Sequence, residues 1–230
     1  MGVGTFIHHI GTFLLLVALV LLIVVDVTAP VVNKRAIMRV HLGNTVPGNQ
    51  VTFGTFGYCH LGIRDSDECS HSRIGYNPAA VMSRIDGSTF SRSAERSAKV
   101  LTRVMVLHPI ATFLCLVALL LCIAAGMVGS FLAAIFAGLA FLTTIIAMIC
   151  DFVLFSIIKH DVNKHGRSRA SWSSGIWLML VSAICTLLAS AIVFSTCCVR
   201  RSSKRRATQN KDETWTETTP APRRHFWQRR

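Results

Sequence analysis

Hydrophobic residues fall into four long runs along the chain, and polar segments separate them. The runs cover roughly residues 10–25, 104–126, 131–158 and 175–199. With its apolar flanks, each run reaches the ~20 residues that a helix needs to cross a bilayer. The pattern predicts an all-α membrane protein in which four transmembrane helices form one bundle.

The expected segments follow from these runs. In chain order they are 1–29 for the N-terminus and first span, 30–103 for a large loop, 104–126 and 127–158 for the second and third spans, 159–174 for a short loop, 175–199 for the fourth span and 200–230 for a basic tail. A cleaved signal peptide is the alternative for the first run. It requires a basic start, and no Lys or Arg precedes Lys34, so a retained helix is preferred.

The large loop differs in character from the rest of the chain. Glycines alternate there with Thr and aromatic residues, a composition that favours short strands with tight turns or bulges. The residues of this motif are Phe53, Gly54, Phe56, Gly57, Tyr58, Gly75 and Tyr76. Near the end of the loop, residues 91–103 predict an amphipathic helix, with Ala94, Ala98 and Leu101 on one face.

Two cysteines, Cys59 and Cys69, bracket a short polar segment of this loop. The other six cysteines lie in or beside apolar runs, which leaves these two with only each other as partners. A bridge across about ten residues removes roughly 3 kcal/mol of unfolded-state entropy on the chain-entropy model. We therefore expect a disulfide, with two free thiols as the alternative.

Composition and charge support the membrane assignment. The chain is 52% hydrophobic and 15% charged, whereas soluble domains carry about a quarter charged residues. The formal net charge is +13, and it is concentrated in the polar segments. One cluster follows the fourth span directly: Arg200, Arg201, Lys204, Arg205 and Arg206.

This cluster predicts the sidedness of the bundle. Basic residues beside a span stay cytoplasmic, and four spans place both termini on that side. The large loop then lies outside, where a disulfide persists. The basic residues of the short loop, among them Lys159 and Lys164, argue weakly for the opposite orientation.

The same cluster is expected to contact anionic membrane lipid, at roughly 1 kcal/mol per basic residue. A tethered tail at a membrane rarely meets DNA, so no nucleic-acid partner is expected. Cys197 and Cys198 precede the cluster and are candidates for palmitoylation. The alternative is that they are simply small residues at a helix end.

Asp26 and Asp151 are the acidic residues inside the predicted spans. Intramembrane carboxylates are often functional, but each lies near the outer end of its helix. Solvation at the interface is preferred over a contact within the bundle, and over proton transfer.

Ser130, Ala134 and Gly138 follow one another at four-residue steps. They predict either a seam for close helix contact or ordinary small-residue usage.

The sequence offers no catalytic chemistry. It has no Gly-rich phosphate loop, no HExxH motif and no nucleophile with a readable base. A metal site built from Cys59, His60, Cys69 and His71 would require a reduced loop. Loop histidines titrate near neutral pH, yet exposed ones are usually only solvated. We expect a non-enzyme without catalytic residues, cofactor, metal or small-molecule substrate.

Taken together, these motifs resemble the fungal SUR7/PalI family of four-span plasma-membrane proteins over roughly residues 8–200. The resemblance rests on the segments 28–32 and 53–59, on Cys69 and residues 74–76, on Leu107-His108-Pro109, and on Asp151. It implies a claudin-like layout, with a stapled extracellular loop containing short strands.

Within the family, the chain looks most like the PalI branch. That likeness implies a plasma-membrane component of alkaline-pH signalling that assists a seven-span, PalH-like sensor. The tail of about 30 residues is shorter than in many PalI-like proteins, which leaves open a Sur-type organiser of plasma-membrane domains. A small transporter is the third alternative, but it would require broken helices or paired charges within the membrane.

Overall fold

The computed structural model describes residues 3–32, 35–63, 66–124, 127–165 and 167–217, and of residues 3–5, 127–128 and 200–217 it describes the backbone only. Six helices are present in these ranges: α1 (Val3–Asp26), α2 (Pro78–Ile85), α3 (Arg92–Val104), α4 (Leu107–Ile123), α5 (Met127–His165) and α6 (Ser174–Glu217). Four segments of the described chain are long and apolar enough to cross a membrane: Phe6–Asp26, Arg92–Ile123, Gly129–His165 and Ser174–Val199. The predicted four-helix membrane fold is confirmed.

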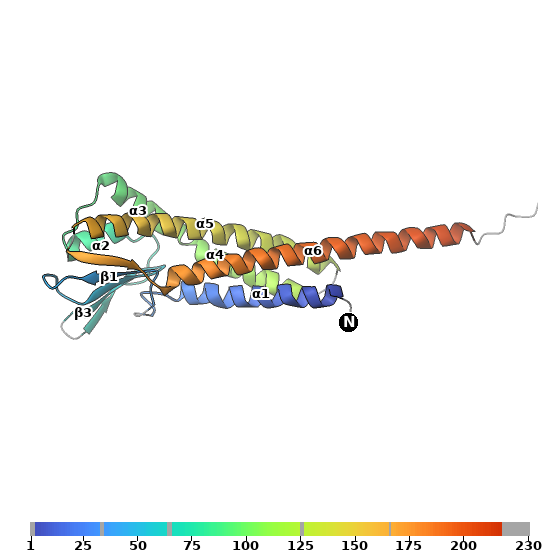
Figure 1. Cartoon of the computed structure of the whole chain (residues 1–230), viewed down its shortest axis with the longest axis horizontal. Helices are drawn as coiled ribbons and strands as arrows, with labels where there is room; N and C mark the ends of the chain where they lie inside the picture. Colours follow the sequence, from blue (N-terminus) through green and yellow to red (C-terminus); the bar gives the residue numbers. More distant parts are fainter. Residues whose placement is uncertain (1–2, 33–34, 64–65, 125–126, 166, 218–230) are drawn as a thin grey trace, which may run out of the picture.

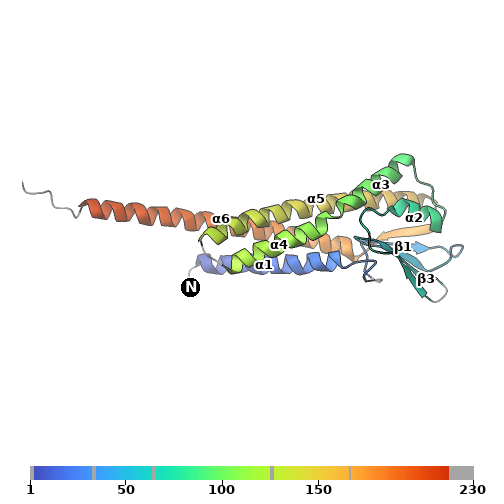
Figure 2. The ribbon, with the colours of Figure 1, turned by 180° about the vertical axis from the view of Figure 1, so that it is seen from behind.

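The bundle consists of α1, α4 and the parts of α5 and α6 that run beside them (Figures 1 and 2). Its main contacts join α1 to α4, α4 to α5, α5 to α6 and α6 back to α1, so each helix packs against two neighbours. Alanines, cysteines and leucines fill the core. Large apolar side chains such as Phe13, Leu142 and Leu188 stay exposed on the outside, where lipid would surround them.

A five-stranded antiparallel sheet caps one end of the bundle (Figure 1). Its strands are β1 (Met38–Leu42), β2 (Gln50–Phe53), β3 (Tyr58–Ile63), β4 (Ser66–Cys69) and β5 (Ser168–Trp172), in the order β4-β3-β2-β1-β5. Together with α2 and α3, this sheet forms what we call the head. The predicted strands in the large loop are confirmed.

Segment 159–174 differs from the expected short loop. α5 continues through it to His165, and β5 then pairs with β1 in a register that includes Val40 opposite Ala170. The pattern gave no sign of this strand, because Ser168–Trp172 is short and polar and its partner lies in a distant part of the chain.

α5 belongs to both parts of the molecule. With 39 residues it is about 58 Å long at 1.5 Å per residue, which exceeds the thickness of a bilayer core. Its first part lies in the bundle. Its last turns carry Leu154, Phe155, Ile158 and Val162 into the core of the head. The head is therefore built directly onto the third span.

The amphipathic helix predicted over residues 91–103 is present as α3, and together with α2, which the sequence pattern did not predict, it holds the remaining side of the head. Ser91 caps α3 by accepting a hydrogen bond from the Ala94 amide, and Ala98 is buried on the predicted face. Asn77 caps α2 in the same way through the Ala80 amide. α6 continues as a helix through the basic cluster to Glu217, away from the head (Figure 2).

Candidate functional site at the junction of head and bundle

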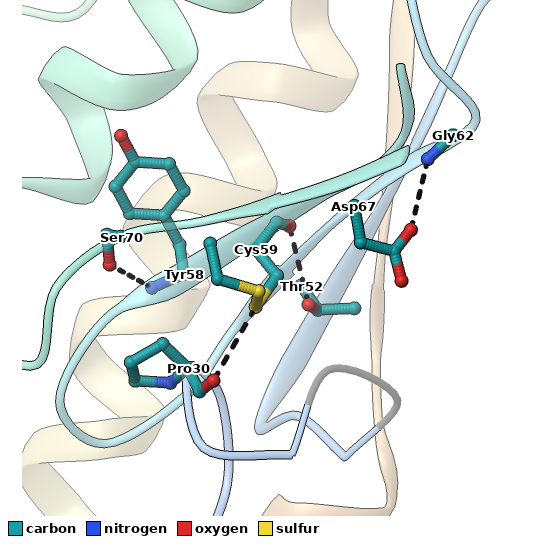
Figure 3. Close-up of a disulfide and its surroundings, with 8 residues drawn as sticks. Pro30, Thr52, Tyr58, Cys59, Gly62, Asp67 and Ser70 are labelled. Carbon is teal, nitrogen blue, oxygen red and sulfur yellow. Dashed lines mark hydrogen bonds between the residues drawn. A yellow bond between two sulfur atoms is a disulfide. The ribbon is translucent and has the colours of Figure 1, made fainter. Parts of the chain in front are cut away.

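The predicted disulfide joins Cys59 and Cys69, with an S–S distance of 2.07 Å (Figure 3). These residues are direct partners across β3 and β4. Beside the bridge, the Tyr58 amide donates to Ser70 Oγ at 3.1 Å, and the Ser70 amide donates to the Tyr58 carbonyl at 2.9 Å. All four residues of β4 are exposed, so the bridge adds a covalent link to an edge strand that pairs only with β3 in the described sheet.

Three aromatic members of the motif, Phe53, Tyr58 and Tyr76, form one cluster. The Phe53 and Tyr76 rings stack with centroids 6.5 Å apart, and Tyr58 lies 6.2 Å from Phe53. Tyr76 is buried, and its hydroxyl donates to the Gly54 carbonyl at 2.8 Å. Burial raises the pKa of Tyr76 above its ordinary value, so the phenol remains a neutral donor in alkaline solution.

The glycines of the motif allow close backbone approach. A Cβ on Gly54 would collide with the backbone of Ala29, and one on Gly57 would meet Ser70 Oγ. Gly75 has a φ of +75°, and a Cβ there would press on the Arg103 side chain. Phe56 is half-buried, and its carbonyl accepts from the Arg73 amide at 2.9 Å.

Threonines connect this motif to the helices. Thr55 donates through its hydroxyl to the Val25 carbonyl at 3.0 Å, and its amide donates to Thr28 Oγ1 at 3.0 Å. On the other side, the Thr102 hydroxyl of α3 donates to the Tyr76 carbonyl at 2.7 Å. The motif is therefore bonded to the end of α1 and to α3. Thr28 and Thr55 lie in segments that carry the family resemblance, but the sequence did not predict these contacts, because the spacing of the threonines carries no pattern.

Both intramembrane acids make contacts between helices. Asp151 is buried on α5, and its Oδ2 lies 2.9 Å from Nε2 of buried His108 on α4. Thr112, one turn further along α4, donates to Asp26 Oδ2 of α1 at 2.6 Å. The expectation of interfacial solvation for Asp151 is wrong. The sequence pattern did not predict His108 as its partner, because the two residues are 43 positions apart and meet only when α4 packs on α5.

The His108 ring fixes the proton count of this pair. Nδ1 lies 3.1 Å from the Met105 carbonyl, an oxygen that only accepts, so Nδ1 carries a hydrogen. The short contact between Nε2 and Oδ2 therefore holds one further proton, and the pair as a whole is neutral. Because the pair carries no net charge, burying it between two helices costs less desolvation free energy than burying a single charge would.

A sequence comparison places the chain among known proteins. The model of the SUR7/PalI family matches residues 7–203. The chain belongs to the SUR7/PalI family. A curated relative, the pH-response regulator protein palI/RIM9 of Emericella nidulans, is 34% identical over 119 residues. That alignment covers 50% of this chain and 18% of the relative, so the chain spans less than a fifth of that protein's length.

In this SUR7/PalI chain the first two members of the small-residue seam of α5 face inward. Ser130 and Ala134 are buried, whereas a Cβ on Gly138 would meet no atom within 4 Å. Ser130 and Ala134 therefore pack against the chain's own helices, whereas Gly138 makes no close helix contact. Among the described residues no three His, Cys, Asp or Glu side chains gather as metal ligands.

The tail residues lie at the opposite end of the molecule from the head. Cys197 is half-buried and Cys198 exposed, both as free thiols. Arg200, Arg201, Lys204, Arg205 and Arg206 lie on the continuation of α6, and their side chains are outside the described residues. Palmitoylation and anionic-lipid binding there remain predictions.

Proposed function

We propose that this SUR7/PalI-family protein is a non-enzymatic component of ambient alkaline-pH signalling in the plasma membrane. In this role it assists the localisation or stability of a seven-span, PalH-like pH sensor. The observation that carries the proposal is the 34% identity to the pH-response regulator protein palI/RIM9. The aligned stretch is half of this chain.

The arrangement of the junction supports an assisting role. The disulfide sheet, the aromatic cluster and the ends of α1 and α3 are linked by direct hydrogen bonds. α4 in turn contacts acidic residues on α1 and α5. Such a construction holds two surfaces, one on the head and one facing lipid, in a fixed relation, as a membrane partner with its own spans would require.

We propose that the head faces the outside and both termini the cytoplasm. The start of α1 and the extension of α6 lie at the end away from the head (Figure 1). The disulfide in the head favours the oxidising side. The basic residues after the fourth span favour the cytoplasm for the other end.

The test compares the surface level of the seven-span sensor in cells with and without this protein at alkaline pH. We expect a lower sensor level and impaired alkaline growth when the protein is missing. Cys59→Ser should reproduce the loss, whereas Cys150→Ser, a free thiol on α5, serves as the matched control. A normal sensor level with normal alkaline growth would reject the role.

The second candidate function is organisation of a plasma-membrane domain. The family match favours it as well, because that family includes the SUR7 branch. Loss of the protein would then disperse a membrane domain without changing sensor delivery. Imaging of the protein's own distribution in the same cells separates the two functions.

A further inference from the structure

A basic groove runs along the last turns of α5 beside β5. Its volume is about 620 Å³, and it is lined by Ser156, Lys159, His160, Asn163, Lys164 and Trp172. The four residues Ser156, Lys159, Asn163 and Lys164 recur at helical spacing on one face of α5. This groove belongs neither to the disulfide sheet nor to the buried junction.

The walls of the groove are fixed by specific contacts. Asn163 Oδ1 accepts from the Ala170 amide at 2.7 Å, and Asn163 Nδ2 donates to the Ala170 carbonyl at 3.3 Å. The Trp172 ring packs on Phe152 with centroids 5.5 Å apart, and Lys159 Nζ lies 5.2 Å from its centre. Strand and helix therefore hold the indole and the first lysine in place.

The groove begins where the lipid-facing surface of α5 ends. Large exposed apolar residues follow one another along the helix up to Val153, which is 46% exposed. At 1.5 Å per residue, Lys159 lies about 9 Å beyond Val153. The polar layer of a bilayer leaflet is roughly 5–8 Å thick, and lysine side chains reach back along their apolar stems. Both Trp172 and the 56% exposed Trp177 of α6 suit that interface.

The charge of the groove is positive and uncompensated. Within the described part of the chain, neither Lys159 nor Lys164 forms an ion pair, and no acidic side chain lines the groove. Asp161 is the nearest acid along α5, and it lies outside the lining. Two ammonium groups beside polar Ser156 and His160 form a donor-rich pocket that suits a phosphate.

We propose that this groove binds the phosphate of a phospholipid headgroup in the leaflet next to the head. A bilayer lipid is favoured over a soluble phosphate because the groove lies on the same helix directly after the lipid-facing surface of α5. The site also gives Lys159 and Lys164 a role that does not depend on which way the molecule is oriented.

The test uses the full chain in nanodiscs that contain a phosphatidylglycerol analogue with a photoactivatable group next to its phosphate. Cross-links are mapped by mass spectrometry, and we expect a strong product within residues 156–172. The double variant K159Q/K164Q should reduce that product by about fivefold per lysine, from roughly 1 kcal/mol for each basic residue. Cross-links near residues 200–206 provide the internal reference in every sample.

The matched control is R96Q/K99Q, which removes the same charge from exposed positions on α3 and should leave the product unchanged. A diacylglycerol analogue with the same acyl chains should give little product in the groove. The proposal is overturned if K159Q/K164Q labels as well as the unaltered protein while its disulfide is intact. The proposal is also overturned if added inorganic phosphate abolishes the cross-linked product, since the site would then bind a soluble ion and not a lipid.

Discussion

At the scale of single residues, Tyr76 connects three parts of the junction. Its ring stacks on Phe53, its hydroxyl reaches Gly54, and its carbonyl receives Thr102. One residue thus touches the sheet, the glycine turn and α3. Removing its hydroxyl should cost about 1 kcal/mol of unfolding free energy, the usual net value of one hydrogen bond.

Tyr76→Phe should also change the response to high pH. Burial raises the pKa of Tyr76, so the folded state keeps this phenol neutral while the unfolded state ionises it near pH 10. The stabilising contribution is therefore complete below about pH 10 and declines above it by ~1.4 kcal/mol per pH unit. The variant should lack this decline, and its unfolding free energy should approach that of the unaltered protein as the pH rises.

Chemical denaturation in detergent at a series of pH values measures this difference. The chain contains only two tyrosines, so absorbance of the phenolate can follow the same event. In the unaltered protein one phenolate should appear only with unfolding, and in Tyr76→Phe that late step should vanish. A late step that persists in the variant would assign the protected phenol to Tyr58.

His108→Leu should destabilise the bundle, because it leaves Asp151 buried without its partner. Loss of one member of a buried pair costs about 3–5 kcal/mol. The double change His108→Leu with Asp151→Leu should recover much of that loss, since it removes both polar groups. Thermal unfolding in detergent is the measurement, with Thr143→Val on α5 as a control, because that hydroxyl bonds only to its own helix.

An equal loss of unfolding free energy in the single and double variants would show that the pair itself does not stabilise the bundle.

The His108–Asp151 pair also marks the limit of sequence reasoning at this scale. Cys59 and Cys69 were predictable because cysteine chemistry restricts their partners. Thr28, Thr55 and Thr102 were not, because a threonine hydroxyl finds its acceptor only after the chain has folded.

At the scale of elements, the length of the apolar runs predicted the four spans, because a helix in lipid must be apolar all round. Hydrophobic periodicity predicted α3, because one face of that helix packs against a core. It could not predict β5. That strand is fixed by β1 on one side and by Asn163 on the other, and both contacts are tertiary. The extension of α5 beyond the bilayer was also not predictable. Its apolar residues pack into the head core, but in the sequence they look the same as apolar residues that face lipid.

Asn163→Ala should loosen β5 without unfolding the bundle. It removes both hydrogen bonds between this side chain and Ala170, and we expect amide exchange in residues 168–172 to accelerate by about tenfold or more, at roughly 1 kcal/mol per bond. Hydrogen–deuterium exchange of the protein in detergent measures this. His160→Ala, which alters an exposed side chain one turn earlier, should leave the exchange unchanged.

At the scale of the whole molecule, the head and the extended α6 lie at opposite ends of the bundle (Figure 2). A tag with a protease cleavage site, inserted near Gly48, should be cleaved when protease is added to intact cells. The same tag placed after Arg230 should be protected. Both expectations follow from the proposed orientation. Cleavage of the C-terminal tag would reverse it and place the disulfide in a reducing compartment.

The pairing of β1 with β5 also sets an order of events during synthesis. The ribosome makes the first four strands before the third span, but β5 follows that span. Until then β1 presents an open edge, which is a template for wrong pairing. A chain truncated before residue 168 would keep that edge open permanently. The sheet is therefore completed only after three of the four spans have been synthesised.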